Sequence, residues 1–164
     1  MPEVWFQYEK EATLFSPAAI GGFGSFLCAL ALGREVISVF PLSQGTVAFV
    51  LRKQIQAISG SPLQVTGLFD LVEKLGLGLG SLQKVRLAGG PVSEALLNRL
   101  RRHKLSSVTS HYGSTECGGL FSRDLLTEEP MSFLGTSYKG TELRLVGEPA
   151  EDISMSKVGL LEYK

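Results

Sequence analysis

Apolar and polar residues along the first half of the chain follow helix and strand periods in turn. The segment 18–32 is almost wholly apolar and predicts a helix buried in an α/β domain, ended by Gly33. It is too short, and too interrupted by glycine, to predict a membrane span. A strand is predicted at 35–40. Apolar residues at helical spacing then predict an amphipathic helix over 44–58.

The pattern continues as strand and helix after a break at 59–62. Leu63–Val65 is a candidate short strand, and the apolar spacing that follows predicts a helix running to Gly76. The glycine-rich segment 76–80 lacks the third glycine of a dinucleotide fingerprint and precedes a strand instead of following one. We therefore interpret it as a turn.

A strand at Lys84–Ala88 is followed by glycines and by Ser93, which is placed to cap the next helix. Another strand is predicted at Ser107–Ser110, with a loop leaving its end. After Gly119 the chain is predicted to be an irregular surface connection. Period-two strands return near the end of the sequence, at 142–146 and 160–163, joined by an acidic loop over 147–152.

This order of elements predicts an α/β fold with a mostly parallel sheet flanked by helices, followed by the start of a β-rich subdomain. The expected boundary divides residues 1–134 from 135–164. A chain of 164 residues is long enough to bury a substantial core.

Composition narrows the classes of partner. Sixteen basic residues balance sixteen acidic ones, so no net field favours nucleic acid. The basic cluster at 99–104 is interpreted as the wet face and carboxyl end of a helix. Cys28 and Cys117 form neither a disulfide framework nor a zinc spacing. With no signal peptide recognised, a cytoplasmic setting is expected.

Candidate chemistry concentrates between His111 and Gly119. The Tyr112 ring could stack on a purine, the Thr115 hydroxyl could donate to a phosphate oxygen, and the Glu116 carboxylate could hold Mg²⁺. Flanking glycines would let backbone approach a ligand. The alternative is an ordinary glycine-rich turn. His111 is expected to bond to backbone.

Four ordered segments carry a family resemblance. Tyr-Gly-Ser-Thr-Glu at 112–116 resembles the Tyr-Gly-x-Thr-Glu motif of the adenylate-forming superfamily, which includes acyl-CoA synthetases, nonribosomal peptide adenylation domains and luciferases. The segment 87–93 is similar to the Gly-Gly-Ala-Pro-Leu-Ser stretch of that family. Segments 135–145 and 157–162 resemble its Gly-x-Glu-x-Arg-Ile and Gly-Glu-Leu-x-Val regions. Their common order strengthens the match.

The resemblance implies a role for each motif residue. Gly89, Gly90 and Pro91 would line the adenine, with Tyr112 stacked on it and Gly113 beside it. Thr115 would contact the α-phosphate and Glu116 would hold Mg²⁺; these two are the implied catalytic residues. Gly118 and Gly119 would border an acyl pocket. The implied ligands are ATP or AMP, Mg²⁺, a carboxylic acid, and CoA as thiol acceptor.

The resemblance covers roughly residues 60–164, the central part of the family's large N-terminal domain. A Ser/Thr/Gly-rich phosphate loop, a ribose-binding aspartate and a lid with a catalytic lysine, all typical of the family, have no counterpart here. We therefore expect a fragment or short relative of an AMP-forming acid–thiol ligase, inactive alone. A noncatalytic scaffold, pairing through an exposed sheet edge as a homodimer, is the alternative. An unrelated α/β protein with chance motif matches is a third.

Overall fold

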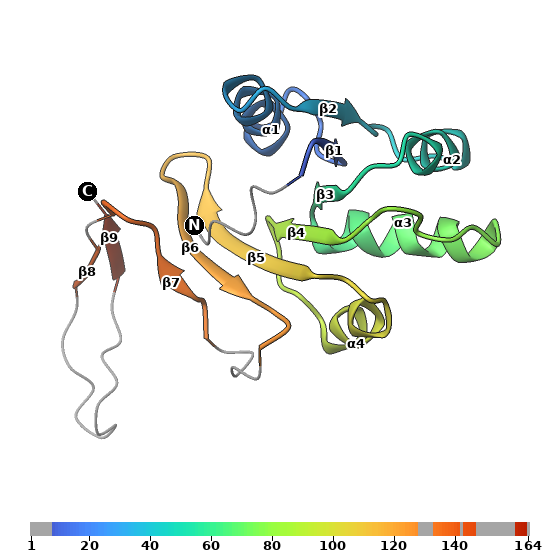
Figure 1. Cartoon of the computed structure of the whole chain (residues 1–164). Coiled ribbons are helices and arrows are strands. Elements are labelled where there is room, and N and C mark those ends of the chain that lie inside the picture. Colours follow the sequence, from blue (N-terminus) through green and yellow to red (C-terminus); the bar gives the residue numbers. More distant parts are fainter. Residues whose placement is uncertain (1–7, 128–132, 142, 147–159, 164) are drawn as a thin grey trace.

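The computed structural model describes residues 8–127, 133–141, 143–146 and 160–163, which form two β-sheets and four helices (Figure 1). The helices are α1 (Ile20–Ala31), α2 (Gln44–Arg52), α3 (Pro62–Lys74) and α4 (Glu94–Arg102). The strands are β1 (Lys10–Thr13), β2 (Glu35–Ser38), β3 (Ala57–Gly60), β4 (Lys84–Ala88), β5 (Ser107–Ser114), β6 (Gly118–Asp124), β7 (Thr136–Ser137), β8 (Leu143–Val146) and β9 (Leu160–Tyr163).

The larger sheet has seven strands in the order β2-β1-β3-β4-β5-β6-β7. Pairing is parallel from β2 to β5 and antiparallel from β5 to β7, so the predicted mostly parallel α/β fold is confirmed. Because crossovers between parallel strands are right-handed, α1 lies on one face of the sheet and α2, α3 and α4 on the other (Figure 1). The small sheet pairs β8 with β9.

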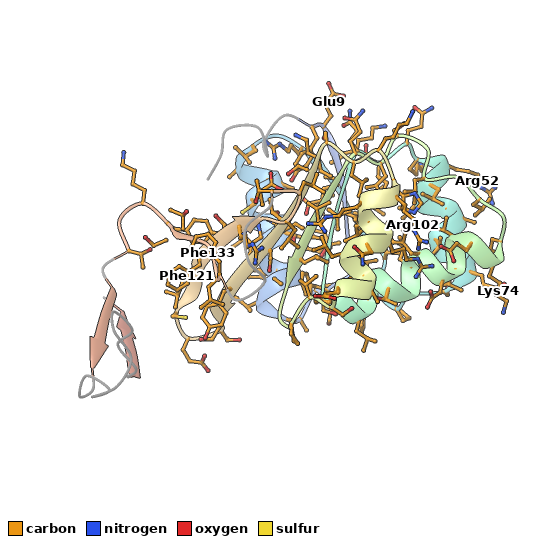
Figure 2. The ribbon with its side chains drawn as sticks, turned by 90° about the horizontal axis from the view of Figure 1, so that it is seen from below. Glu9, Arg52, Lys74, Arg102, Phe121 and Phe133 are labelled. Carbon is orange, nitrogen blue, oxygen red and sulfur yellow. The ribbon has the colours of Figure 1, made fainter. Side chains whose placement is uncertain are left out.

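The hydrophobic core lies between the sheet and α2, α3 and α4. Alternate strand residues such as Ile58, Leu87 and Val108 point into it and are fully buried, as is Phe69 of α3. Charged side chains of these helices, such as those of Arg52 and Lys74, lie at the periphery (Figure 2). One face of the sheet is therefore covered by an apolar core.

The opposite face of the sheet is polar. Glu11 of β1 is buried and makes an ion pair with Arg86 of β4, with 3.2 Å between Oε1 and Nη2. The same Nη2 donates to Ser25 Oγ of α1 at 3.0 Å, and the Tyr8 hydroxyl donates to Glu11 Oε2 at 2.6 Å. A buried charge pair is tolerated here because neighbouring side chains satisfy it by hydrogen bonds.

The predicted helix over 44–58 is too long. It ends at Arg52, Gln54 has a φ of 55°, and Ala57–Gly60 is the buried strand β3. The apolar residues Ile55 and Ile58 continued the helical spacing of α2 by coincidence, and a strand of four residues is too short to show a clear period-two pattern. The candidate strand Leu63–Val65 is also wrong: Ser61 caps α3 and Pro62 opens it.

The helix predicted over 18–32 is confirmed as α1, but its predicted burial is wrong. Only small residues of this helix, Gly22, Ser25 and Ala29, are buried, and Ser25 contacts Ser59 of β3. Phe23 and Leu30 are 54% and 80% exposed. The apolar run correctly predicted where the helix lies in the sequence. The small residues determine which face of the helix contacts the sheet.

The surface connection predicted after Gly119 is wrong as far as Asp124, because those residues form β6. The strand predicted to end at Ser110 continues to Ser114, and β1 was not predicted at all. The turn at 76–80 and the strand Lys84–Ala88 are confirmed, as are the late strands, now β8 and β9. Glu142 and the acidic loop at 147–152 lie outside the described residues. The domain boundary after residue 134 stays a prediction.

Candidate functional site

The motif stretch from His111 to Gly119 forms a β-hairpin. The strands β5 and β6 pair antiparallel, and residues 115–117 make the turn between them. Register shifts between Tyr112 and Gly113, so the hairpin carries a bulge directly at the motif. The stretch predicted as a loop is therefore a paired hairpin, with residues 115–117 unpaired at its tip.

The second predicted segment follows β4. Gly89 adopts a φ of 79°, which lets the chain turn sharply out of the strand. Ser93 then caps α4, its Oγ accepting from the Leu96 amide at 3.2 Å, as predicted. A strand, a glycine turn and a capped helix thus hold the backbone of Gly90 and Pro91 at the carboxyl end of the sheet.

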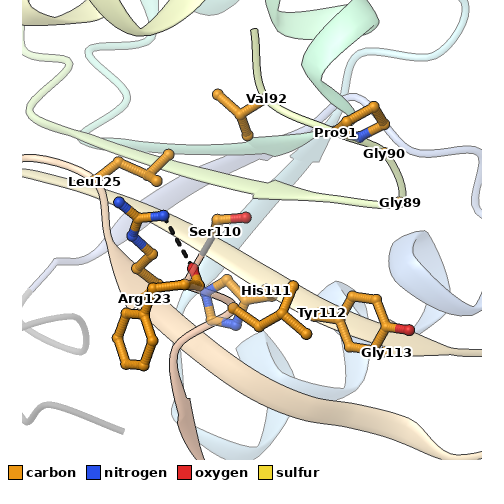
Figure 3. Close-up of a pocket in the computed structure, with 12 residues that line it drawn as sticks. Gly89, Gly90, Pro91, Val92, Ser110, His111, Tyr112, Gly113, Arg123 and Leu125 are labelled. Carbon is orange, nitrogen blue, oxygen red and sulfur yellow. Dashed lines mark hydrogen bonds between the residues drawn. The ribbon is translucent and has the colours of Figure 1, made fainter. Parts of the chain in front are cut away.

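The turn after β4 and the hairpin face one cavity of about 570 Å³ (Figure 3). This volume suits a small organic ligand. Its lining residues come from four segments: Gly89, Gly90, Pro91, Val92, Ser110, His111, Tyr112, Gly113, Arg123, Leu125, Phe133 and Leu134. The structure therefore brings five residues of the predicted site together, three from the first bend and two from the second.

Tyr112 is one of the aromatic residues that line this cavity. The residue is 48% exposed, and its ring meets that of Phe121 across the hairpin with the ring centroids 6.0 Å apart. The cross-strand contact holds the ring in place, while the exposed area leaves room for stacking on a planar ligand.

Thr115 and Glu116 lie at the exposed tip of the hairpin and do not line the cavity. Hydrogen bonds from the Ser114 side chain and from its own backbone lower the pKa of Glu116, so its carboxylate is ionised at neutral pH. The described residues contain no cluster of three or more metal-ligating side chains. A single carboxylate fits Mg²⁺, which keeps waters and substrate phosphates as its other ligands.

Gly118 and Gly119 also lie outside the cavity lining. Gly118 has a φ of 67° at the end of the turn. A Cβ on Gly119 would lie 2.8 Å from Cε2 of Tyr138, so the Tyr138 ring covers this position. The acyl-pocket role of the two glycines stays a prediction.

His111 does not bond to backbone as expected. Its Nδ1 is hydrogen-bonded to the Tyr138 hydroxyl and its Nε2 lies 3.0 Å from Thr109 Oγ1. Burial lowers the pKa of His111 to about 4, and the Arg86 charge contributes in the same direction. The imidazole is therefore neutral at physiological pH.

Sequence reasoning missed most of the far wall of the cavity. Arg123 and Leu125 come from β6 and the residue after it, and Phe133 and Leu134 precede β7. The Arg123 guanidinium donates from Nη1 to the Phe133 carbonyl at 2.9 Å (Figure 3). Residues 120–125 read Leu-Phe-Ser-Arg-Asp-Leu and do not alternate between apolar and polar, so no period-two signal marked this strand.

Both cysteines are free thiols, as predicted. In the described part of the chain no helix is long and apolar enough to cross a bilayer.

Comparison with known proteins places these features in a family. The sequence model of the AMP-binding enzyme family matches residues 5–163. The 4-chlorobenzoate–CoA ligase of Pseudomonas sp. (strain CBS-3) is 29% identical over 98 residues, which are 59% of this chain and 19% of that ligase.

Two solved structures share the fold. A long-chain-fatty-acid–CoA ligase of Archaeoglobus fulgidus superposes with a TM-score of 0.75 and 15% identity, covering 95% of this chain and 34% of that one. The o-succinylbenzoate CoA synthetase of Bacillus subtilis, in complex with ATP and magnesium ion, gives a TM-score of 0.71 and 20% identity, covering 88% and 31%. The chain thus spans about a third of each structure and about a fifth of the matched ligase. With 159 of its residues inside the family match, this chain belongs to the AMP-binding enzymes, the adenylate-forming superfamily.

Proposed function

We propose that this chain forms the adenine-binding part of an AMP-forming acid–thiol ligase. The observation that carries the proposal is the single cavity shared by the Gly89–Val92 turn and the Tyr112 hairpin (Figure 3). These two segments lie far apart in the sequence but line the same cavity. The family resemblance assigns adenine binding to both of them. In this proposal the purine lies between the backbone of Gly90 and the ring of Tyr112.

In the proposed reaction, a carboxylate oxygen attacks the α-phosphorus of ATP, a new acyl O–P bond forms, and the bond to the bridging oxygen of pyrophosphate breaks. Negative charge grows on the phosphate oxygens. The Thr115 hydroxyl would donate to an α-phosphate oxygen, and Mg²⁺ held by Glu116 would neutralise charge. A thiol then displaces AMP from the acyl-adenylate. CoA is the proposed thiol, in a cytoplasmic enzyme acting on fatty or related acids.

The Ser/Thr/Gly-rich phosphate loop, the ribose-binding aspartate and the catalytic lysine typical of the family have no counterpart among these residues. We therefore propose that the 164-residue chain alone binds adenine nucleotide weakly and gives no adenylation turnover. Acid-dependent exchange of pyrophosphate into ATP by the pure chain would contradict this.

The test of nucleotide binding is calorimetry with AMP on the intact chain and on Tyr112→Ala. Base stacking on an aromatic ring contributes about 1–3 kcal/mol, so the variant should bind at least about fivefold more weakly. Phe49→Ala is the matched control, because Phe49 is 51% exposed on α2 and does not line the cavity. Equal affinity of Tyr112→Ala and the parent chain would refute the stacking role.

A second candidate is a noncatalytic module that pairs with a copy of itself. It is favoured by the exposed apolar side chains of α1, including Ile20, Phe23, Leu27 and Leu30, beside the edge strand β2. Light scattering distinguishes the candidates: a stable dimer that is indifferent to AMP favours the module, and a monomer excludes it.

A further inference from the structure

We infer that Tyr138 is a positioning residue for the Tyr112 hairpin: its ring seated on Gly119 and its hydroxyl bonded to His111 hold the strand from which Tyr112 reaches the cavity. Tyr138 contributes nothing to the cavity lining itself. The part of the proposal that concerns nucleotide affinity rests on the function proposed above, and the part that concerns the hairpin does not.

The first contact is steric. Gly119 pairs with Gly113 across the hairpin, directly beside the register shift that follows Tyr112. A Cβ on Gly119 would lie 2.8 Å from Cε2 of Tyr138, so the ring occupies the space that a side chain would fill. The Tyr138 ring therefore packs against the backbone of the bulge on the β6 side.

The second contact is a chain of hydrogen bonds. The Tyr138 hydroxyl is bonded to His111 Nδ1, the two rings are nearly parallel at 21°, and His111 Nε2 lies 3.0 Å from Thr109 Oγ1. Burial raises the pKa of Tyr138, so its hydroxyl keeps its proton and can donate to a neutral imidazole. His111 then donates from Nε2 to Thr109, which fixes the ring along β5.

Backbone contacts hold Tyr138 against the hairpin. Its amide donates to the Leu120 carbonyl at 3.0 Å. The residue before it, Ser137, pairs with Phe121 of β6. Gly135 allows this approach, since a Cβ there would lie 2.2 Å from the Ser122 carbonyl oxygen. The segment 135–138 is thus held against β6, the strand that pairs with the Tyr112 strand β5.

The consequence for Tyr112 follows from strand geometry. Successive side chains leave a strand on opposite faces, so the His111 and Tyr112 rings leave β5 on opposite sides. A His111 ring fixed on one side limits the twist of the strand on the other. Tyr138 therefore acts on the ligand ring through its neighbour, with no contact to the ligand.

The test uses Tyr138→Phe, which keeps the ring and removes the hydroxyl, and Tyr138→Ala, which removes both. Lys139→Ala is the control at an exposed neighbouring position. The imidazole of His111 is followed by NMR against pH, and since the chain has two histidines, a His103→Gln background leaves one signal. Arg86 of β4 and Tyr138 are the charged or titratable groups that face it among the described residues.

In the parent chain and in Lys139→Ala, His111 should stay neutral from pH 5 to 8. In Tyr138→Ala the pKa of His111 should rise towards its ordinary value of about 6.5, because the ring that covers the imidazole is gone while the Arg86 charge remains. Tyr138→Phe should keep His111 neutral but lose the preference for the tautomer protonated on Nε2. AMP affinity should fall about five- to tenfold in Tyr138→Ala, as expected for a lost buried contact, and less in Tyr138→Phe.

Titration of His111 near 6.5 in the parent chain would overturn the proposal, as would an unchanged AMP affinity in Tyr138→Ala. Should the parent chain bind no AMP, the function proposed above fails, and amide exchange at 112–114 decides the positioning role instead. Faster exchange there in both Tyr138 variants supports it, and exchange equal to that of Lys139→Ala overturns it.

Discussion

Gly113 and Gly118 approach so closely across the hairpin turn that a Cβ on Gly113 would lie 1.9 Å from the Gly118 carbonyl oxygen. The obstructing atom belongs to the backbone and not to a flexible side chain, so it cannot move aside without disturbing the strand pairing. The glycine after Tyr112 is thus required by the pairing of β5 with β6 and by the bulge between them. The family motif therefore has a structural cause at this position as well as a proposed functional one.

The first prediction is that Gly113→Ala opens the hairpin. We expect the free energy of unfolding to fall by about 2–4 kcal/mol, because the overlap forces the strands apart. Urea denaturation measures this. Gly24→Ala is the control: its Cβ would meet no atom within 4 Å, and alanine in the interior of α1 should raise stability by up to about 1 kcal/mol. Equal effects of the two substitutions would contradict the steric account.

The second prediction separates the two glycines of the cavity turn. Gly89 has a φ of 79°, so Gly89→Ala should cost about 1–2 kcal/mol although space around it is open. A Cβ on Gly90 would first meet Cδ of Pro62 at 3.6 Å, an ordinary contact, so Gly90→Ala should change stability by less than about 0.5 kcal/mol. Thermal or urea unfolding of both variants measures these two changes in stability. A larger loss in Gly90→Ala would show that the turn is constrained differently.

Local sequence signals predicted the parts of the fold that they determine. Ser93 was identified as a helix cap because the capping preference depends on a few adjacent residues, and the cap is observed. The strand β4 and the glycine turn after it were predicted for the same reason. These elements supply one side of the cavity.

Features set by tertiary contacts were missed. Ala57–Gly60 resembles the end of a helix until its neighbours β1 and β4 are known, because burial on both faces removes the alternation. The hairpin was predicted as a loop, since the pairing of Tyr112 with Phe121 is not visible in either strand alone. Arg123 consequently went unrecognised as a cavity residue.

The third prediction concerns the buried ion pair of Glu11 and Arg86. Glu11→Leu should destabilise the chain by about 3–5 kcal/mol, because it leaves a guanidinium in a buried site without its carboxylate. Adding Arg86→Met should recover part of that loss, since an apolar pair carries no desolvation penalty. A double-mutant cycle tests this: the free energy of unfolding is measured by denaturation for Glu11→Leu, for Arg86→Met and for the double variant. Additive losses would mean that the two charges do not interact.

The last prediction is a pH dependence of stability caused by His111. Burial lowers the pKa of His111 in the folded chain to about 4, against an ordinary value of 6.5. The unfolded chain therefore takes up this proton first as pH falls. The stabilisation is complete above about pH 6.5 and is lost progressively towards pH 4, by at most about 3 kcal/mol.

His111→Gln isolates this effect, because glutamine can still hydrogen-bond to Tyr138 and Thr109 but takes up no proton in this range. Carboxylates also destabilise the chain at low pH, and they do so equally in both proteins. The free energy of unfolding, measured from pH 8 to 4.5, should therefore fall less steeply with decreasing pH in the variant. Because the difference grows only where the unfolded histidine is protonated, the two curves should run parallel above pH 7. Parallel curves throughout would mean that His111 has the same pKa folded and unfolded, and that its imidazole is not held neutral by the fold.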